Sequence, residues 1–120
     1  MIFVNILDEH TILVYYRYMH VIAKPALVAF WTQHPDAENA LNTWYRTMQK
    51  EVFTDFNHLR ATFPSADLVD KLTVFNISGN KYRLIAEIYY AQRVVLIRNV
   101  LTHTEYDRGN WKRGNSWHTQ

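Results

Sequence analysis

Hydrophobic positions in the first half of the chain recur at helical spacing. Apolar side chains between residues 37 and 48 stand three or four positions apart, which places them on one face of a helix. A shorter segment before Pro35 has the same spacing and begins at Lys24-Pro25, where proline suits a first helical turn. The members of the two stripes are Leu27, Phe30, Trp31, His34, Ala37, Ala40, Leu41, Trp44, Tyr45 and Met48. This pattern predicts two helices joined by a tight break, an αα-hairpin whose apolar stripe belongs to the core.

Two neighbouring segments complete the first half. Thr54 or Asp55 is a candidate cap for a short third helix holding Phe56, Leu59 and Phe63, and residues 63–67 are expected to form a loop. Residues 12–18 favour a β-strand. We expect either that residues 1–18 are an N-terminal extension to a domain starting at Met19, or that Ile12 to Ile22 forms one long strand.

From Leu72 the hydrophobic period changes to two, the period of a half-buried strand. Gly79-Asn80 lies between two such runs and is a two-residue hairpin signal. A tight turn there opposes Asn76 to Arg83 and Phe75 to Leu84. A second turn at Ala91-Gln92 returns residues 94–101 as a third strand.

The alternation assigns these positions to two faces of a sheet. One face is apolar and should meet the helices: Phe75, Ile77, Tyr82, Leu84, Ala86 and Ile88. The other is polar and should face solvent or a ligand: Asn76, Ser78, Lys81, Arg83 and Glu87. Arg98 joins this polar face in a regular register, whereas a β-bulge would move it to the other side.

Charge is unevenly distributed along the 120 residues. The formal net charge is only +2, but residues 79–120 hold seven Lys or Arg against three Asp or Glu. Such a local surplus suits an anionic partner, although basic residues also serve simply to solvate a surface.

Composition and motifs exclude several classes of chemistry. The chain has no cysteine, which removes disulfides, zinc–thiolate sites and cysteine nucleophiles. The histidines lack metal-ligand spacing, and no glycine-rich nucleotide loop is present. We therefore expect neither a metal nor a cofactor. The first residues have no basic n-region and Asp8 interrupts their apolar run, so we expect no signal peptide and no membrane association.

Groups suited to phosphate chemistry gather at the ends of the predicted strands. Arg83 and Arg98 could neutralise a phosphate, and His103 exchanges protons near neutral pH. Tyr106 follows three residues after His103, so a helical turn would place both on one side. Lys81 and Asn76 could position RNA, and together these residues supply what metal-free RNA cleavage requires.

Each of these residues also has a structural explanation. Arg83 and Asn76 could be an ordinary cross-strand pair, Arg98 could pair with Glu87, and Tyr106 could simply seat the last turn on the sheet. Residues 108–120 form a basic aromatic tail, which we expect to be mobile. Trp111 and Trp117 in that tail could stack on RNA bases, anchor a protein partner or be disordered.

The same segments resemble a known family. Residues 19–107 are similar to HigB-type toxins of bacterial type II toxin–antitoxin pairs, within the RelE-like superfamily. The resemblance is carried by Met19-His20-Val21-Ile22, the Phe30-Trp31 helix, His34-Pro35-Asp36-Ala37, Phe63-Pro64-Ser65-Ala66, Val74-Phe75-Asn76-Ile77, Gly79-Asn80-Lys81-Tyr82-Arg83-Leu84, Ile97-Arg98 and Thr102-His103-Thr104-Glu105-Tyr106-Asp107. The joint presence of the hairpin segment and the Thr-His-x-Glu-Tyr-Asp segment makes the match specific.

The resemblance implies a small α+β fold, with N-terminal helices packed on a small twisted antiparallel sheet. It implies a cytoplasmic endoribonuclease that cleaves mRNA in the ribosomal A site without a metal, leaving a 2′,3′-cyclic phosphate and a 5′-hydroxyl. It implies inhibition by a HigA-type helix-turn-helix antitoxin, and contact with operator DNA only indirectly through that antitoxin. Arg83 falls where relatives have a catalytic arginine, His103 near a second cationic position and Tyr106 near a C-terminal tyrosine.

Two rival functions are compatible with the residues alone. One is a catalytically inert module that binds RNA or the ribosome. The other is a protein-interaction domain whose sheet face serves a partner. We expect the toxin, with Arg83, Arg98, His103 and Tyr106 as catalytic residues and Asn76 and Lys81 as RNA-binding residues.

Overall fold

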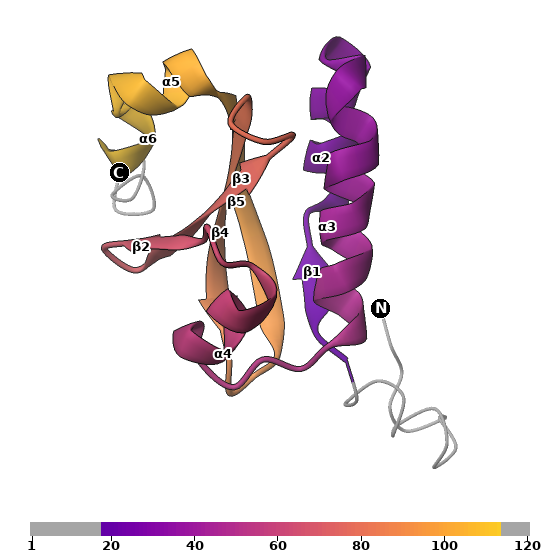
Figure 1. Cartoon of the computed structure of the whole chain (residues 1–120), viewed down its shortest axis with the longest axis vertical. Helices are drawn as coiled ribbons and strands as arrows, with labels where there is room; N and C mark the ends of the chain where they lie inside the picture. Colours follow the sequence, from indigo (N-terminus) through magenta and orange to yellow (C-terminus); the bar gives the residue numbers. More distant parts are fainter. Residues whose placement is uncertain (1–17, 114–120) are drawn as a thin grey trace.

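A five-stranded sheet forms the centre of the molecule (Figure 1). The computed structural model describes residues 18–113. The strands are β1 (His20–Ile22), β2 (Asp67–Val69), β3 (Leu72–Ile77), β4 (Tyr82–Tyr89) and β5 (Val94–Thr102), in the spatial order β1-β5-β4-β3-β2. β1 runs parallel to β5, and the other neighbours are antiparallel. The fold is therefore α+β, but the sheet is mixed and the expectation of a purely antiparallel sheet is wrong.

Helices precede and follow the strands in sequence. They are α2 (Lys24–Gln33), the 3₁₀ turn η2 (Pro35–Ala37), α3 (Glu38–Lys50), α4 (Phe56–Thr62), α5 (His103–Arg108) and α6 (Asn110–Arg113). Pro25 lies in the first turn of α2, and the break before α3 comes at Pro35, as the sequence predicts. Asp55 caps α4, because its side chain accepts a hydrogen bond of 2.8 Å from the backbone N–H of His58.

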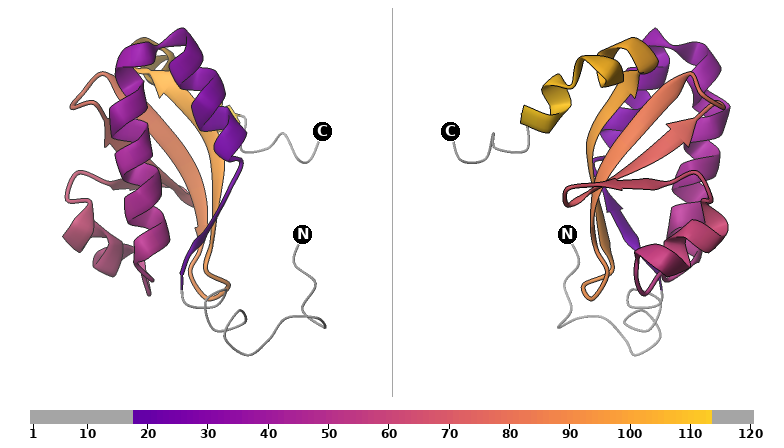
Figure 2. Two further views of the ribbon diagram at one scale, coloured as in Figure 1. Left: turned by 90° about the vertical axis from the view of Figure 1, so that its right-hand side faces the viewer. Right: turned by 60° about the vertical axis from the view of Figure 1, so that its left-hand side comes forward.

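The larger core lies between the sheet and the two long helices. Figure 2 shows α2 and α3 side by side along one side of the sheet. Leu41 and Trp44 of α3 belong to the same buried cluster as Phe75, Leu84 and Ile97 of the sheet. The Trp44 and Phe75 rings meet edge to face with centroids 5.4 Å apart. The prediction that the apolar stripe of the two helices belongs to the core is therefore confirmed.

A second, smaller core covers the opposite face of the sheet. It consists of Leu72, Val74, Ile85 and Trp111, with Val69, Leu101 and Tyr106 packed against it. Trp111 of α6 is only 5% exposed, so it is not available to stack on RNA bases, and the folded part continues past Asp107. This face is consequently part buried, and the expectation that it lies open to solvent or ligand holds only for some of its positions, such as the exposed Asn76. Trp117 lies outside the described residues.

The β3–β4 hairpin has the predicted register. Asn76 faces Arg83 and Phe75 faces Leu84 across the two strands. Residues 78–81 make the turn, in which the Lys81 N–H donates to the Ser78 carbonyl at 3.3 Å. Ser78 and Gly79 both have positive φ, of 54° and 66°. Glycine takes this conformation without strain, which explains its place in the turn.

A β-bulge interrupts the pairing of β4 with β5. Ile85 faces Asn99 and the next residue, Ala86, faces Ile97, so Arg98 is the extra residue of β5 at the bulge. The bulge reverses the orientation of the residues that follow. Val95 and Ile97 join the larger core before the bulge; after it, Val100 packs on that core and Leu101 on the smaller one.

Two further features differ from the expectations. β2 falls partly within the segment expected to be a loop, because only three residues pair with the edge of β3 and leave no alternating run to detect. β1 begins at His20, and the strand expected from residue 12 falls on residues 1–17, outside the described part of the chain. Among the residues that the structure describes, no helix combines the length and apolar character needed to cross a bilayer.

Replacing Trp111 tests the importance of the smaller core. We expect Trp111→Ala to lower the free energy of unfolding by about 3 kcal/mol, because it removes a large buried ring. Thr104→Ala, an exposed change on α5, is the control and should alter it by about 0.5 kcal/mol or less. Urea denaturation followed by circular dichroism measures both. Equal stability of the two variants would mean that α6 contributes nothing to the fold.

Candidate active site

Arg83 is the centre of the candidate site, on β4 immediately after the hairpin turn. Only 8% of the residue is exposed, so the expectation of an exposed strand position is wrong. Its Nη1 donates to the carbonyl oxygens of Asn80 at 3.2 Å and Tyr82 at 3.1 Å, and its Nη2 donates to the Asn80 side-chain oxygen at 2.5 Å. All of these acceptors are neutral, so the guanidinium is held without losing its charge to a carboxylate.

Tyr106 covers one side of this guanidinium. The central carbon of the Arg83 guanidinium lies 5.4 Å from the centroid of the Tyr106 ring, within range of a cation–π contact. Trp111 stacks on that ring at 5.0 Å, and its indole N–H donates to the Tyr106 carbonyl at 2.9 Å. Burial raises the pKa of the Tyr106 phenol, as does the Asp67 carboxylate, while Arg83 opposes the shift. The phenol is therefore protonated at neutral pH.

His103 begins α5, the helix that bears Tyr106. The cap of this helix is reciprocal: the Glu105 N–H donates to the Thr102 hydroxyl at 3.2 Å, and the Thr102 N–H donates to the Glu105 carboxylate at 2.9 Å. The His103 N–H donates to the Lys81 carbonyl at 3.0 Å, which ties the helix to the hairpin turn. The His103 imidazole contacts Asp107 through Nδ1, at 2.8 Å from Oδ2. That contact leaves Nε2 as the other ring atom able to exchange a proton.

Asn76 lies directly across the strands from Arg83 and is exposed. Asn76 is therefore an exposed position on the face of the sheet that carries Arg83 and the smaller core. An exposed amide beside a nearly buried guanidinium can both donate and accept hydrogen bonds to an incoming ligand.

The Lys81 side chain is directed toward the helices and not toward the Arg83 guanidinium. Its ammonium forms an ion pair with Asp36 of η2, and the Tyr82 hydroxyl donates to the same carboxylate at 2.7 Å. The hydrogen bonds from Lys81 and Tyr82 lower the pKa of Asp36, and the Asp36 carboxylate raises the pKa of both partners. The contact joins the junction of the long helices to the hairpin turn. The expectation that Lys81 shares the polar face with Arg83 is thus wrong.

Arg98 is also held away from Arg83. Its Nε and Nη2 both donate to one carboxylate oxygen of Glu87, at 3.0 and 2.5 Å. Glu87 is four residues along β4 from Arg83, about 13 Å at the spacing of a strand. The pairing of Arg98 with Glu87, which was the structural alternative to a catalytic role, is thus confirmed.

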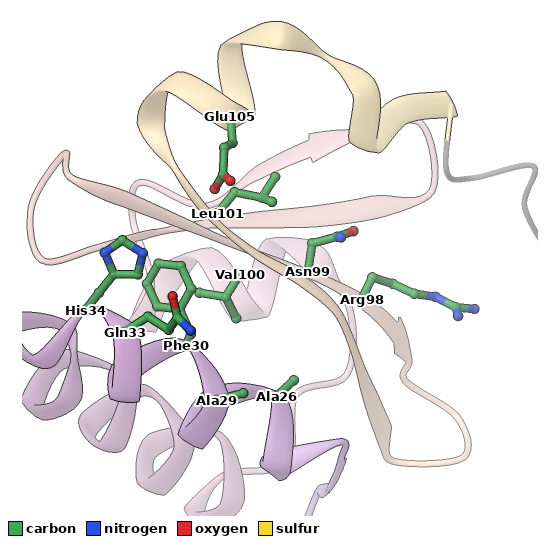
Figure 3. A pocket seen from close by; sticks show the side chains of 10 residues that line it. All are labelled: Ala26, Ala29, Phe30, Gln33, His34, Arg98, Asn99, Val100, Leu101 and Glu105. Carbon is green, nitrogen blue, oxygen red and sulfur yellow. The ribbon is translucent and has the colours of Figure 1, made fainter.

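A pocket of about 450 Å³ lies beside Arg98, between α2 and β5 (Figure 3). Its lining includes Phe30 and His34 of α2, Val100 of β5 and Glu105 of α5. Figure 3 shows the Arg98 side chain at the opposite end of the pocket from His34. The lining does not include Arg83 or Tyr106, so this pocket is distinct from the candidate site.

The structure therefore assembles part of the predicted set. Arg83, Tyr106 and Asn76 are neighbours, and His103 shares a helix with Tyr106 and a backbone hydrogen bond with the turn. Three contacting residues were not identified from the sequence: Asn80, Asp36 and Asp107. The spacing of Asp107 four residues after His103 could have revealed the pair, whereas Asp36 and Lys81 are 45 positions apart. Within residues 18–113 no group of three or more His, Asp or Glu side chains is arranged to hold a metal ion.

Comparison with known proteins identifies the family. Residues 37–109 match the model of HigB toxins, described as the RelE-like toxic component of a toxin–antitoxin system. The chain belongs to the HigB toxin family. The matched residues run from the end of η2 to the end of α5, and so include the β3–β4 hairpin and the helix of His103 and Tyr106.

Curated HigB proteins are similar over most of their length. The mRNA interferase toxin HigB of Escherichia coli K12 is 36% identical over 92 residues, which cover 74% of this chain and 88% of that protein. The mRNA interferase HigB of Shigella flexneri matches to the same extent. The mRNA interferase HigB of Escherichia coli O6:H1 is 28% identical over 93 residues, which cover 75% of this chain and 90% of that protein.

The Asp36 ion pair predicts a pH dependence of stability. Asp36→Asn should reduce the free energy of unfolding at pH 6–7, because the folded-state pKa of Asp36 is lowered. A lowered pKa gives stability that is full above the unfolded value, about 3.9, and is lost as the pH falls through the folded value. Urea midpoints of wild type and variant should therefore converge as the pH falls through the lowered folded-state pKa of Asp36. Asp70→Asn, an exposed change in a turn, controls for removal of a carboxylate. A wild-type advantage that persisted in full at low pH would contradict the assignment.

Proposed function

We propose that this chain is the toxin of a toxin–antitoxin pair and is an endoribonuclease that cleaves mRNA on the ribosome. Membership of the HigB family, whose curated relatives are named mRNA interferases, carries the proposal. We also infer that the architecture is RelE-like, with α2 and α3 packed on the twisted sheet. The candidate site supplies a cation, a neutral phenol and an imidazole at one end of that sheet.

In the proposed reaction the ribose 2′-oxygen attacks the neighbouring phosphorus and the bond from phosphorus to the 5′-oxygen breaks. Arg83 stabilises the charge that builds up on the phosphorane oxygens, since its own charge is not neutralised by a carboxylate. The products are a 2′,3′-cyclic phosphate and a 5′-hydroxyl. No water and no metal is needed to balance these bonds.

His103 and Tyr106 move the two protons of this reaction. The raised pKa of Tyr106 keeps its phenol protonated, so it can give a proton to the leaving 5′-oxygen. The imidazole of His103 takes the proton from the 2′-hydroxyl, with Asp107 on Nδ1 orienting the ring. Asn76 contacts the RNA beside Arg83. Arg98 and Lys81, which are paired with Glu87 and Asp36, contribute to the wider RNA surface rather than to the phosphorane.

The proposal also specifies the setting. A nuclease acting on translated mRNA works in the cytoplasm, in the ribosomal A site, and must be held inactive by an antitoxin. We propose a HigA-type helix-turn-helix antitoxin, with operator DNA contacted only through it. Residues 1–18 are proposed to be an extension that cleavage does not require.

Expression without antitoxin tests the activity. Wild type should arrest growth, and transcripts from arrested cells should carry 2′,3′-cyclic phosphate and 5′-hydroxyl ends. Arg83→Lys should lower the cleavage rate by about 100-fold or more, because lysine keeps the charge but not the forked geometry. Arg93→Lys, at the turn that joins β4 to β5, is the control. Growth arrest with intact transcripts would favour a catalytically inert ribosome-binding module.

His103→Gln separates proton transfer from binding. We expect cleavage of mRNA on programmed ribosomes to fall by roughly 100- to 10,000-fold, the range for a general acid or base, with little change in ribosome affinity. His58→Gln on α4 is the matched control. Equal losses of rate and affinity would assign His103 to positioning, and an unchanged rate would assign it to the structure of α5.

A further inference from the structure

Asn80, in the turn between β3 and β4, makes an unusual double contact with Arg83. Its side-chain oxygen accepts from Nη2 at 2.5 Å and its backbone carbonyl accepts from Nη1 at 3.2 Å. The Tyr82 carbonyl is the second acceptor for Nη1, at 3.1 Å. Asn80 thus accepts from both Nη1 and Nη2, the two nitrogens that form the end of the guanidinium fork.

The remaining donors form the side of the fork. A guanidinium has five N–H groups in one plane, so Nε and the second hydrogen of Nη2 are left over. No hydrogen bond within residues 18–113 uses these two donors. They point in parallel, and this is the edge that binds two oxygens of a phosphate together. The contacts with Asn80 thus use the end of the guanidinium, and among the described residues Nε, on the phosphate-binding edge, has no hydrogen-bond acceptor.

The neutrality of Asn80 matters as much as its position. Arg98 offers a comparison within the same sheet, because Glu87 takes the Nε and Nη2 edge of that residue with a charged carboxylate. Arg83 is held with similar closeness by an amide, and it is only 8% exposed. A cation that is shielded from water and not neutralised exerts a stronger field on a nearby anion.

We propose that Asn80 is a positioning residue that fixes the Arg83 guanidinium, through a neutral acceptor, in the orientation needed to receive the scissile phosphate. Tyr106 completes the arrangement by covering the face of the guanidinium. The inference rests on the proposed catalytic role of Arg83. It adds that the hairpin turn, and not the strand alone, determines how that arginine acts.

The test measures kcat and KM for cleavage of mRNA on programmed ribosomes. Asn80→Ala should lower kcat by roughly 10- to 100-fold with KM nearly unchanged, since a displacement of about 1 Å at a reacting group can cost about 100-fold. In an Arg83→Lys background the same substitution should have almost no effect, because a lysine ammonium cannot use this acceptor pair. Asn57→Ala, an exposed change on α4, is the matched control.

Three outcomes would overturn the proposal. An unchanged kcat for Asn80→Ala would show that Arg83 needs no such support. Equal effects in the wild-type and Arg83→Lys backgrounds, or an effect on KM alone, would assign Asn80 to a direct RNA contact. Full activity of Arg83→Lys would show that a charge suffices without the fork and would remove the positioning role of Asn80, whereas full activity of Arg83→Ala would remove the catalytic role of Arg83 itself.

A second variant serves in case the alanine disturbs the turn. Asn80→Asp keeps the acceptor atoms and the turn preference but adds a negative charge beside Arg83. We expect it to fold and to lower kcat at least as far as Asn80→Ala, because the carboxylate neutralises the guanidinium. Wild-type kcat in a folded Asn80→Asp protein would contradict the requirement for a neutral acceptor.

Discussion

The four-residue turn between β3 and β4 is the constraint on which the candidate site depends. Its backbone and side chains reach three separate parts of the molecule. The Asn80 oxygens hold Arg83, the Lys81 carbonyl accepts from the first residue of α5, and the Lys81 ammonium pairs with Asp36 between the long helices. Because one turn makes all three contacts, a shift of the turn would displace the Arg83 guanidinium, the start of α5 at His103 and the junction of α2 and α3 together.

The sheet keeps this turn in place through two unequal cores. The larger one packs the long helices against one face, and the smaller one packs Trp111 against the other. β4 contributes to both, with Leu84 facing one and Ile85 the other. A central strand buried on both sides is resistant to local opening. Arg83 therefore stands on one of the most rigid strands of the fold, although it lies next to an exposed turn.

Much of this arrangement could be predicted from local sequence, but its long-range contacts could not. The Gly79-Asn80 signal was sufficient for the register that places Asn76 opposite Arg83, since a short turn allows few alternatives. Periodicity likewise located the helices before and after Pro35. The pairing of Lys81 with Asp36 depends on how the helical layer sits on the sheet, which no local pattern encodes. Trp111 was misjudged because a short basic segment shows no period, and its burial comes from contacts with the sheet and with Tyr106.

The bulge at Arg98 has a consequence for how the sequence of β5 can vary in length. Residues before and after it are in opposite phase, so the strand behaves as two segments joined by one extra residue. Deleting Arg98 would leave Ile97 opposite Ala86 and Asn99 opposite Ile85 as consecutive pairs, so Val100 and Leu101 would each keep their core. The strand can therefore lose its bulge residue, and with it the pairing of Arg98 with Glu87, without disturbing either core, whereas one added residue elsewhere in β5 would reverse the faces of the residues beyond it.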